Sequence, residues 1–171
     1  MTSIFEASGG DRAFLALAAA WHRRCLQDPV VSHAFSHPGQ HPQHVERLAA
    51  YWAEAMGGPP TYSRSMGDES RVVRMHSGNG EHQEMDERAQ LCFARALDDA
   101  GFPDDVRLRT ALKDYFRWAT TAMAAHPDSA AGVPDGLPVP RWSWHGPVDA
   151  GGNGADVGDD DPPAGFEPPS G

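Results

Sequence analysis

The stretch from Val72 to Gly80, VVRMHSGNG, holds a histidine at the end of a short apolar turn, followed closely by two glycines. Val72 and Val73 precede His76 by four and three residues, so on a helix the imidazole shares a face with both valines. Gly78 and Gly80 interrupt helical spacing, so only a short helix fits before them. A histidine on an apolar face is usually a core or boundary residue, and the alternative is that it is held there to bind something.

The segments on either side of this stretch show helical spacing. Apolar residues at intervals of three and four predict helices from about Gly10 to Cys25 and from about Pro42 to Met56, the second ended by Gly-Gly-Pro-Pro. The same spacing predicts two long helices over 85–100 and 105–123, while TYSRSMGDES (61–70) reads as a polar linker. No segment alternates with period two. The sequence therefore predicts an all-α domain over residues 1–125.

Residues 126–171 differ from the rest in composition. They are rich in proline, glycine and aspartate, and from Pro127 onward they hold eight acidic residues against one arginine, which is seven of the ten net negative charges. Such a segment buries too little apolar surface to offset its ordering entropy, so most of it is expected to be disordered. Residues 142–145, with two tryptophans, are the expected exception and could dock on the helices.

Composition also excludes several classes of protein. Without the acidic tail the body is close to neutral, which gives a nucleic-acid interface no support. No apolar run is long enough to span a bilayer, and the N-terminus lacks a signal-peptide pattern, so a cytoplasmic protein is expected. Cys25 and Cys92 lie on apolar helical faces, where small buried hydrophobes are favoured over a disulfide.

Nine histidines are many for 171 residues. The spacing of His37, His41 and His44 could suggest a zinc site, but prolines and a glycine break the run and no thiolate or carboxylate lies near to complete a tetrahedral set. His44 shares a helical face with Leu48, which directs its imidazole toward the packed side. His22 follows Trp21 on the first long helix, where it would otherwise be an interfacial histidine.

Several motifs, taken together and in order, resemble the group II truncated haemoglobins. They cover roughly Ser3 to Ala125 and comprise Gly9-Gly10, Trp21-His22, GGPPTYS at 57–63, RMH at 74–76 and LKDYFRWA at 112–119. The resemblance implies a two-over-two helical sandwich around a b-type haem, with a very short helix that carries the proximal histidine.

The same resemblance assigns roles to particular residues. His76 is expected to be the proximal iron ligand, since a neutral imidazole donates to haem iron and an apolar setting keeps the porphyrin dry. Arg74, Tyr62 and Arg71 match positions that hold the haem propionates through charge-assisted hydrogen bonds, and ordinary surface charge is the alternative for them. The remaining expected haem contacts are Phe35, Leu48, Trp52 and Tyr115.

Three positions depart from the pattern of that group. His22 stands where a tyrosine is usual, Ala89 where a tryptophan is usual, and His44 where a small residue is common. Two histidines beside a widened space therefore replace the usual distal hydrogen-bond set, and they are the expected catalytic residues. Each could donate an N–H to a ligand, take a proton from peroxide or bind the iron itself.

The function expected from these features is binding of dioxygen, nitric oxide or a similar small ligand, for redox chemistry or for detoxification of nitric oxide or peroxide. A haem-dependent dioxygenase or a peroxidase-like oxidoreductase is the possible enzyme class, and either would need an external electron donor. The alternatives are a ligand carrier or sensor without catalysis, and a haem-free interaction module with a globin-like fold.

Overall fold

The computed structural model describes residues 1–36 and 40–149, and most regular structure in this part is helical. The elements are α1 (Ile4–Ser8), α2 (Gly10–Gln27), η1 (Val31–Phe35), α3 (His44–Ala55), α4 (Thr61–Ser65), α5 (Glu69–His76), α6 (Gln83–Asp99), α7 (Val106–Met123), η2 (Ala130–Gly132), β1 (Arg141–Ser143) and β2 (Gly146–Val148). The prediction of an all-α class is confirmed, because the two strands form only a short antiparallel hairpin. Within these residues, no helix combines the length and the apolar character that crossing a membrane requires.

Local capping explains where several helices begin. Ser3 and Glu6 form a reciprocal capping box at the start of α1, and Asp68 and Asp105 accept hydrogen bonds from the first turns of α5 and α7. The expectation of a polar linker over 61–70 is wrong. Its polar residues form α4 and open α5, with Asp68 as the cap between them.

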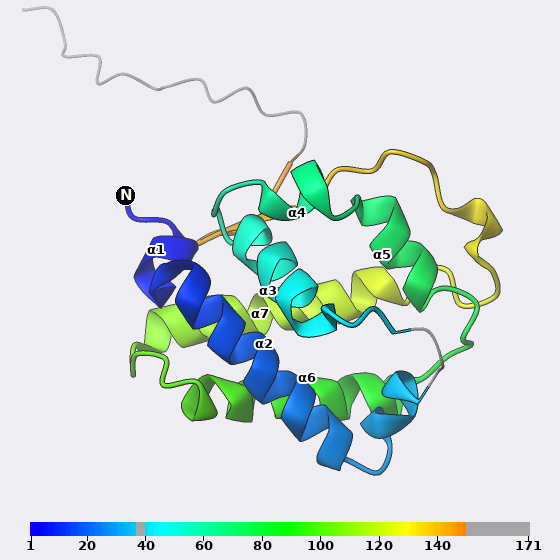
Figure 1. Cartoon of the computed structure of the whole chain (residues 1–171), viewed down its shortest axis with the longest axis horizontal. Helices are drawn as coiled ribbons and strands as arrows, with labels where there is room; N and C mark the ends of the chain where they lie inside the picture. Colours follow the sequence, from blue (N-terminus) through cyan, green and yellow to red (C-terminus); the bar gives the residue numbers. More distant parts are fainter. Residues whose placement is uncertain (37–39, 150–171) are drawn as a thin grey trace, which may run out of the picture.

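The helices enclose an aromatic core. In Figure 1, α2 runs across the front of the molecule, and it packs on α3 on one side and on α6 on the other. Phe93 of α6 stacks on Phe116 of α7 with ring centroids 4.3 Å apart. Trp52 of α3 meets Phe93 edge-on at 5.4 Å, so α3, α6 and α7 share one aromatic centre.

The Gly57-Gly58 pair lets α1 pack against the end of α3. Gly57 has a φ of +94°, a conformation that L side chains rarely adopt. At Gly58, a Cβ would lie 2.6 Å from the Ala53 carbonyl oxygen and 2.7 Å from the Phe5 ring. The turn therefore needs glycine at both positions, for backbone conformation at the first and for space at the second.

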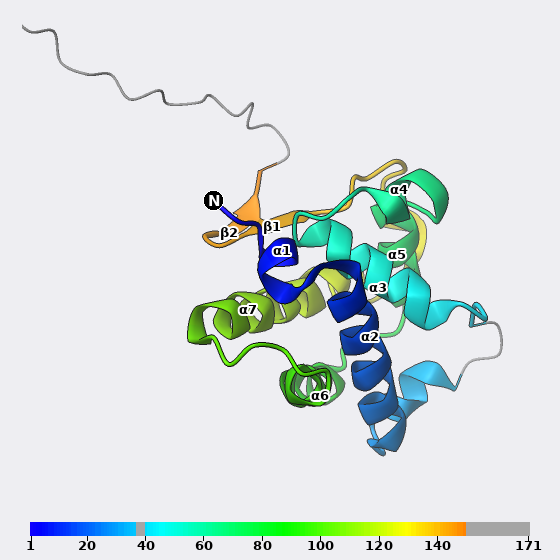
Figure 2. The same ribbon diagram turned by 60° about the vertical axis from the view of Figure 1, so that its left-hand side comes forward.

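Residues 126–149 depart from the expected disorder. Val133 and Val139 are each 6% exposed, and the β1–β2 hairpin lies beside α1 and the N-terminus, as Figure 2 shows. Trp142 packs on Trp118 with centroids 5.5 Å apart, and the Trp144 indole donates to the Thr2 carbonyl at 2.8 Å. A few long-range contacts thus order a segment of low overall hydropathy. Residues 150–171, the rest of the expected disordered tail, lie outside the described part.

Candidate functional site

His76 is the last residue of α5, and its imidazole is exposed. Its Nδ1 lies 2.8 Å from the carbonyl oxygen of Val72, one turn earlier on the helix. In the neutral ring, Nδ1 can form this hydrogen bond only by carrying the proton and donating it. Nε2 then keeps its lone pair, which is the tautomer that a metal-binding histidine needs.

Two ionisable groups lie close enough to His76 for its charge to affect their pKa values. His44 begins α3, and its pKa is lowered first by burial and then by the nearby His22 and His76. Asp86 lies in the first turn of α6 with its carboxylate 3.0 Å from His82; burial raises its pKa, while His82 and then His76 oppose that rise. His76 therefore lies near the starts of α3 and α6.

His22, His44 and Phe35 form one cluster on the α3 side of this region. The His22 ring meets Phe35 edge-on with centroids 5.0 Å apart, Phe35 lies 5.7 Å from His44, and the two imidazoles are 5.4 Å apart. Three separate elements, α2, η1 and α3, supply these rings. The structure thus brings together the two histidines that the sequence assigned to ligand chemistry.

Both histidines of this cluster are held in the neutral form. Burial lowers the pKa of His22, and it is also the main cause of the lowered pKa of His44. The Nε2 atoms of both are shielded from solvent and have no hydrogen-bond partner among residues 1–36 and 40–149. Buried polar atoms are usually hydrogen-bonded, so this pair of nitrogens points to a ligand.

Ala89, the position expected to widen the pocket, lies against Trp21. The indole Nε1 of Trp21 donates to the Ala89 carbonyl at 3.1 Å, and its ring meets Phe35 at 5.7 Å. Trp21 therefore connects the α6 backbone at Ala89 with the Phe35 ring.

Two of the expected haem contacts lie in the packed interior. Trp52 is 4% exposed and Tyr115 is 2% exposed, whereas Leu48 is partly buried at the edge of the core. Burial raises the pKa of Tyr115 far above its ordinary value. Trp52 and Tyr115 thus pack within the interior, while Leu48 and Phe35 lie nearer its boundary.

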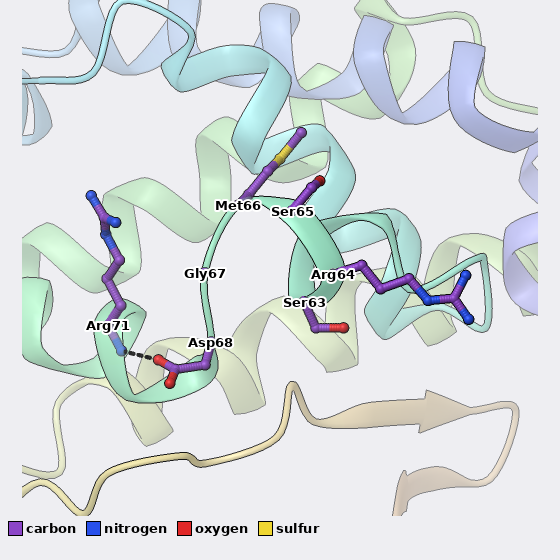
Figure 3. A pocket seen from close by; sticks show the side chains of 7 residues that line it. All are labelled: Ser63, Arg64, Ser65, Met66, Gly67, Asp68 and Arg71. Carbon is purple, nitrogen blue, oxygen red and sulfur yellow. Dashed lines mark hydrogen bonds between the residues drawn. The ribbon is translucent and has the colours of Figure 1, made fainter.

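Tyr62 and Arg71 meet at Gly67. A Cβ at Gly67 would lie 3.0 Å from the Tyr62 hydroxyl and 3.3 Å from Cδ of Arg71. A shallow open pocket of about 480 Å³ is lined by residues 63–68 and by Arg71, and Figure 3 shows Arg71 and Arg64 extending on opposite sides of it. Tyr62 itself is 3% exposed, so Arg71 is the member of this pair that can reach an external carboxylate.

Arg74 already has partners within the chain. Its guanidinium donates to the Val133 carbonyl at 3.2 Å and forms an ion pair with Asp135. Arg74 therefore binds the segment after α7 and does not belong to the same group as Tyr62 and Arg71.

Sequence reasoning missed a buried polar pair close to these residues. The Tyr51 hydroxyl of α3 donates to the Glu69 carboxylate of α5 at 2.6 Å, and Glu69 is 5% exposed. The one available signal was a glutamate within the first turn of the short helix that leads to His76.

The structure describes both cysteines but only two of the three histidines of the zinc alternative. His37 lies outside the described residues, and within those residues no group of three or more His, Cys, Asp or Glu side chains could hold a metal ion. Cys25 and Cys92 are buried free thiols in one small apolar cluster with Val31. Burial raises the pKa of both thiols.

A family model for bacterial-like globins matches residues 3–123. The chain belongs to this family. Among curated proteins, none matches the chain. The globin family implies a haem that binds a small diatomic ligand.

Solved structures share the fold of this globin. A haemoglobin from Chloroflexus aurantiacus is 26% identical with a TM-score of 0.61, covering 72% of this chain and 98% of its own. A haemoglobin from Thermobifida fusca is 29% identical with a TM-score of 0.58, covering 71% and 96%. The group II truncated haemoglobin of Bacillus anthracis, at 18% identity and a TM-score of 0.63, covers 77% and 97%. The expected two-over-two sandwich and the resemblance to group II are confirmed.

The residues present fit a haem. His76 offers an exposed ring with Nδ1 engaged by a backbone carbonyl, and His44, with the His22 ring beside it, lies near His76. Phe35 contributes an aromatic face between η1 and α3. This donor set, an imidazole with aromatic neighbours, is the kind that holds haem iron in globins.

Proposed function

We propose that this globin holds a b-type haem through His76 and takes up dioxygen, nitric oxide or another small diatomic ligand beside His22 and His44. The observation that carries the proposal is the pair of solvent-shielded Nε2 atoms without a hydrogen-bond partner among the described residues, on two neighbouring histidines, one of them near His76. A structural role alone would leave these nitrogens hydrogen-bonded to protein.

When bound, the haem would supply an iron centre that takes a small ligand and changes its oxidation state. The chain's own contribution lies in His22 and His44. Because burial keeps both rings neutral, each carries one N–H and one lone pair. The N–H can stabilise a ligand with partial negative charge, and the lone pair can accept a proton. Phe35, packed edge-on against both rings, limits access of water to the pair.

This chemistry suits redox turnover or the detoxification of nitric oxide or peroxide. Peroxide cleavage requires a proton acceptor next to the ligand, and either of the two histidines can serve as this acceptor. Sustained turnover would use an external electron donor.

The first experiment is titration of the purified protein with haemin, followed by absorption in the ferric and ferrous states. We expect one haemin per chain and a sharp Soret band that is lost or shifted in His76→Ala. His33→Ala, which removes an exposed histidine of η1, is the matched control and should leave the band unchanged. The absence of stoichiometric haemin uptake by the wild type would overturn the proposal.

A second experiment tests the distal histidines. In His22→Ala and His44→Ala, peroxide-dependent oxidation of a chromogenic donor should fall by roughly a hundredfold if the affected residue moves the proton. Haemin stoichiometry should stay at one. Undiminished oxidation in both variants would remove peroxide chemistry and leave ligand binding alone.

A further inference from the structure

Residues 126–137, here termed the strap, lie beyond the residues that match the globin family, and the proposed function does not use them. In Figure 1 this yellow segment leaves α7, passes through η2 and follows α5 toward α4. It therefore lies along the helix whose last residue is His76.

The strap holds the backbone at both ends of α5. At the first residue of the helix, the Glu69 N–H donates to the Leu137 carbonyl at 3.1 Å. After it, the Gly78 and Gly80 N–H groups donate to the carbonyls of His126 and Pro127, each at 2.9 Å.

Ser70 ties α5 to the strap through its side chain. Its hydroxyl donates to the Pro134 carbonyl at 2.6 Å and accepts from the Leu137 N–H at 2.9 Å. Ser70 is 0% exposed, so water cannot replace either partner. Loss of the hydroxyl would leave two polar backbone groups of the strap unsatisfied.

Arg74 adds a third connection two residues before His76. It donates to the Val133 carbonyl and pairs with Asp135, and Val133, itself a strap residue, is 6% exposed. The guanidinium that the family resemblance assigned to a haem propionate is thus engaged by a carboxylate of the same chain.

The rest of the body gives α5 limited support. Val72 and Val73 bury one face of the helix, and α5 contacts α7, η2 of the strap and, through the Tyr51–Glu69 hydrogen bond, α3. The strap is therefore one of several supports that determine where His76 lies.

We propose that the strap is a positioning element for His76, acting through Ser70 and the Arg74–Asp135 pair, and that it sets how tightly His76 holds haem iron. This inference rests on the proposed function and adds residues outside the matched globin segment to its site. Ser70 and Asp135 are positioning residues, because they act through α5.

The test combines two measurements on the full-length chain. The first is the rate at which the ferric holoprotein loses haemin to an excess of apomyoglobin, together with the iron–histidine stretching band of the ferrous form. The second is hydrogen exchange of the α5 amides without haem. We expect Ser70→Ala to speed haemin loss roughly tenfold, to shift the stretching band and to speed α5 exchange selectively.

Asp135→Ala should have a smaller effect in the same direction, roughly threefold, because an exposed ion pair contributes little. Asp135→Glu should restore the wild-type rate. Thr121→Ala, which removes an exposed hydroxyl of α7, and Asp114→Ala, which removes an exposed ion pair of α7, are the matched controls and should leave all three readouts unchanged.

Faster exchange across all helices in Ser70→Ala would overturn the inference, since it would show general destabilisation. An unchanged haemin-loss rate and stretching band with faster α5 exchange would also overturn it, because α5 would then loosen without affecting the iron ligand. Failure of the wild type to bind haemin would overturn the proposed function and this use of the strap together, and only that outcome affects both.

Discussion

The Glu69 carboxyl is buried without a cationic partner on its own helix turn. Burial raises its pKa to about 7, against the opposing effect of the hydrogen bond from Tyr51, and Asp68 adds to the rise. Because Glu69 connects α5 to α3 through Tyr51, its protonation state bears on the two helices that carry His76 and His44.

A pH dependence follows from that carboxyl. Its folded pKa of about 7 lies above the ordinary value of 4.5, so between these pH values the folded state binds more protons than the unfolded state. The Glu69 contribution to the free energy of unfolding therefore falls as pH rises through this window, by at most about 1.4 kcal/mol per pH unit. Glu69→Gln should remove the fall and be more stable than wild type above the window.

Urea denaturation of the wild type and of Glu69→Gln, between pH 4.5 and about 7, measures the difference in their free energies of unfolding. Glu54→Gln is the control, because Glu54 is also buried but both its oxygens accept hydrogen bonds from Ser63. That variant controls for replacing a buried, hydrogen-bonded carboxyl by an amide. A wild-type and Glu69→Gln difference that does not change with pH would contradict the prediction.

The two distal histidines have the opposite pH dependence. Their pKa values lie below 6.5 in the folded state, so as pH falls below that value the unfolded state takes up protons first and stability is lost. Since the charge of His22 also lowers the pKa of His44, His22→Phe should raise the His44 pKa while leaving it below 6.5. Imidazole resonances followed by NMR across this pH range measure the shift, and an unchanged His44 titration would show that the rings are not coupled.

The turn between α3 and α4 depends on the absence of a side chain at Gly58. A Cβ there would meet the Ala53 carbonyl oxygen at 2.6 Å, and backbone cannot move aside as a flexible side chain can. We expect Gly58→Ala to lower the free energy of unfolding by roughly 1–3 kcal/mol or more through this clash. Gly101→Ala separates clash from strain, because Gly101 has a φ of +71° with nothing within 4 Å of its Cβ position. Equal losses in the two variants would contradict a steric role for Gly58.

The sequence predicted the long helices and the short helix that ends at His76, and it missed α4. Apolar residues are spaced by three and four in α2, α3, α6 and α7 because each of these helices buries one long face. This spacing can be recognised from the local sequence alone. Helix α4 has five residues and one buried side chain, Tyr62, so it leaves no period to detect. His22 and His44 could be paired only through the family resemblance, since their approach depends on the crossing of α2 and α3. Neither a local pattern nor the family resemblance indicated the contact between Tyr51 and Glu69.

Across the whole molecule, the segment after α7 connects regions that the helices leave separate. The strap holds α5, Arg141 donates to the Gly58 carbonyl at 3.1 Å, and Trp144 reaches the backbone of Thr2. Composition suggested disorder because proline, glycine and aspartate dominate this segment. Val139 and Trp142 nevertheless pack on the hydrophobic core, and such contacts between residues distant in sequence cannot be detected from a local pattern.

Shortening the chain tests how much these contacts contribute. A chain that ends at Ala125 loses the burial of Val133 and Val139 and the packing of Trp142 on Trp118. The burial of each valine contributes at most roughly 1.5–3 kcal/mol to the free energy of unfolding. A chain that ends at Asp149 keeps every contact described above. We therefore expect the first to unfold at lower urea concentration with a smaller m-value, and the second to match the full-length chain. Trp142→Ala should reproduce part of the loss, since its ring also meets Tyr115 at 5.9 Å. Equal stability of the two shortened chains would mean that the segment rests on the globin body without stabilising it.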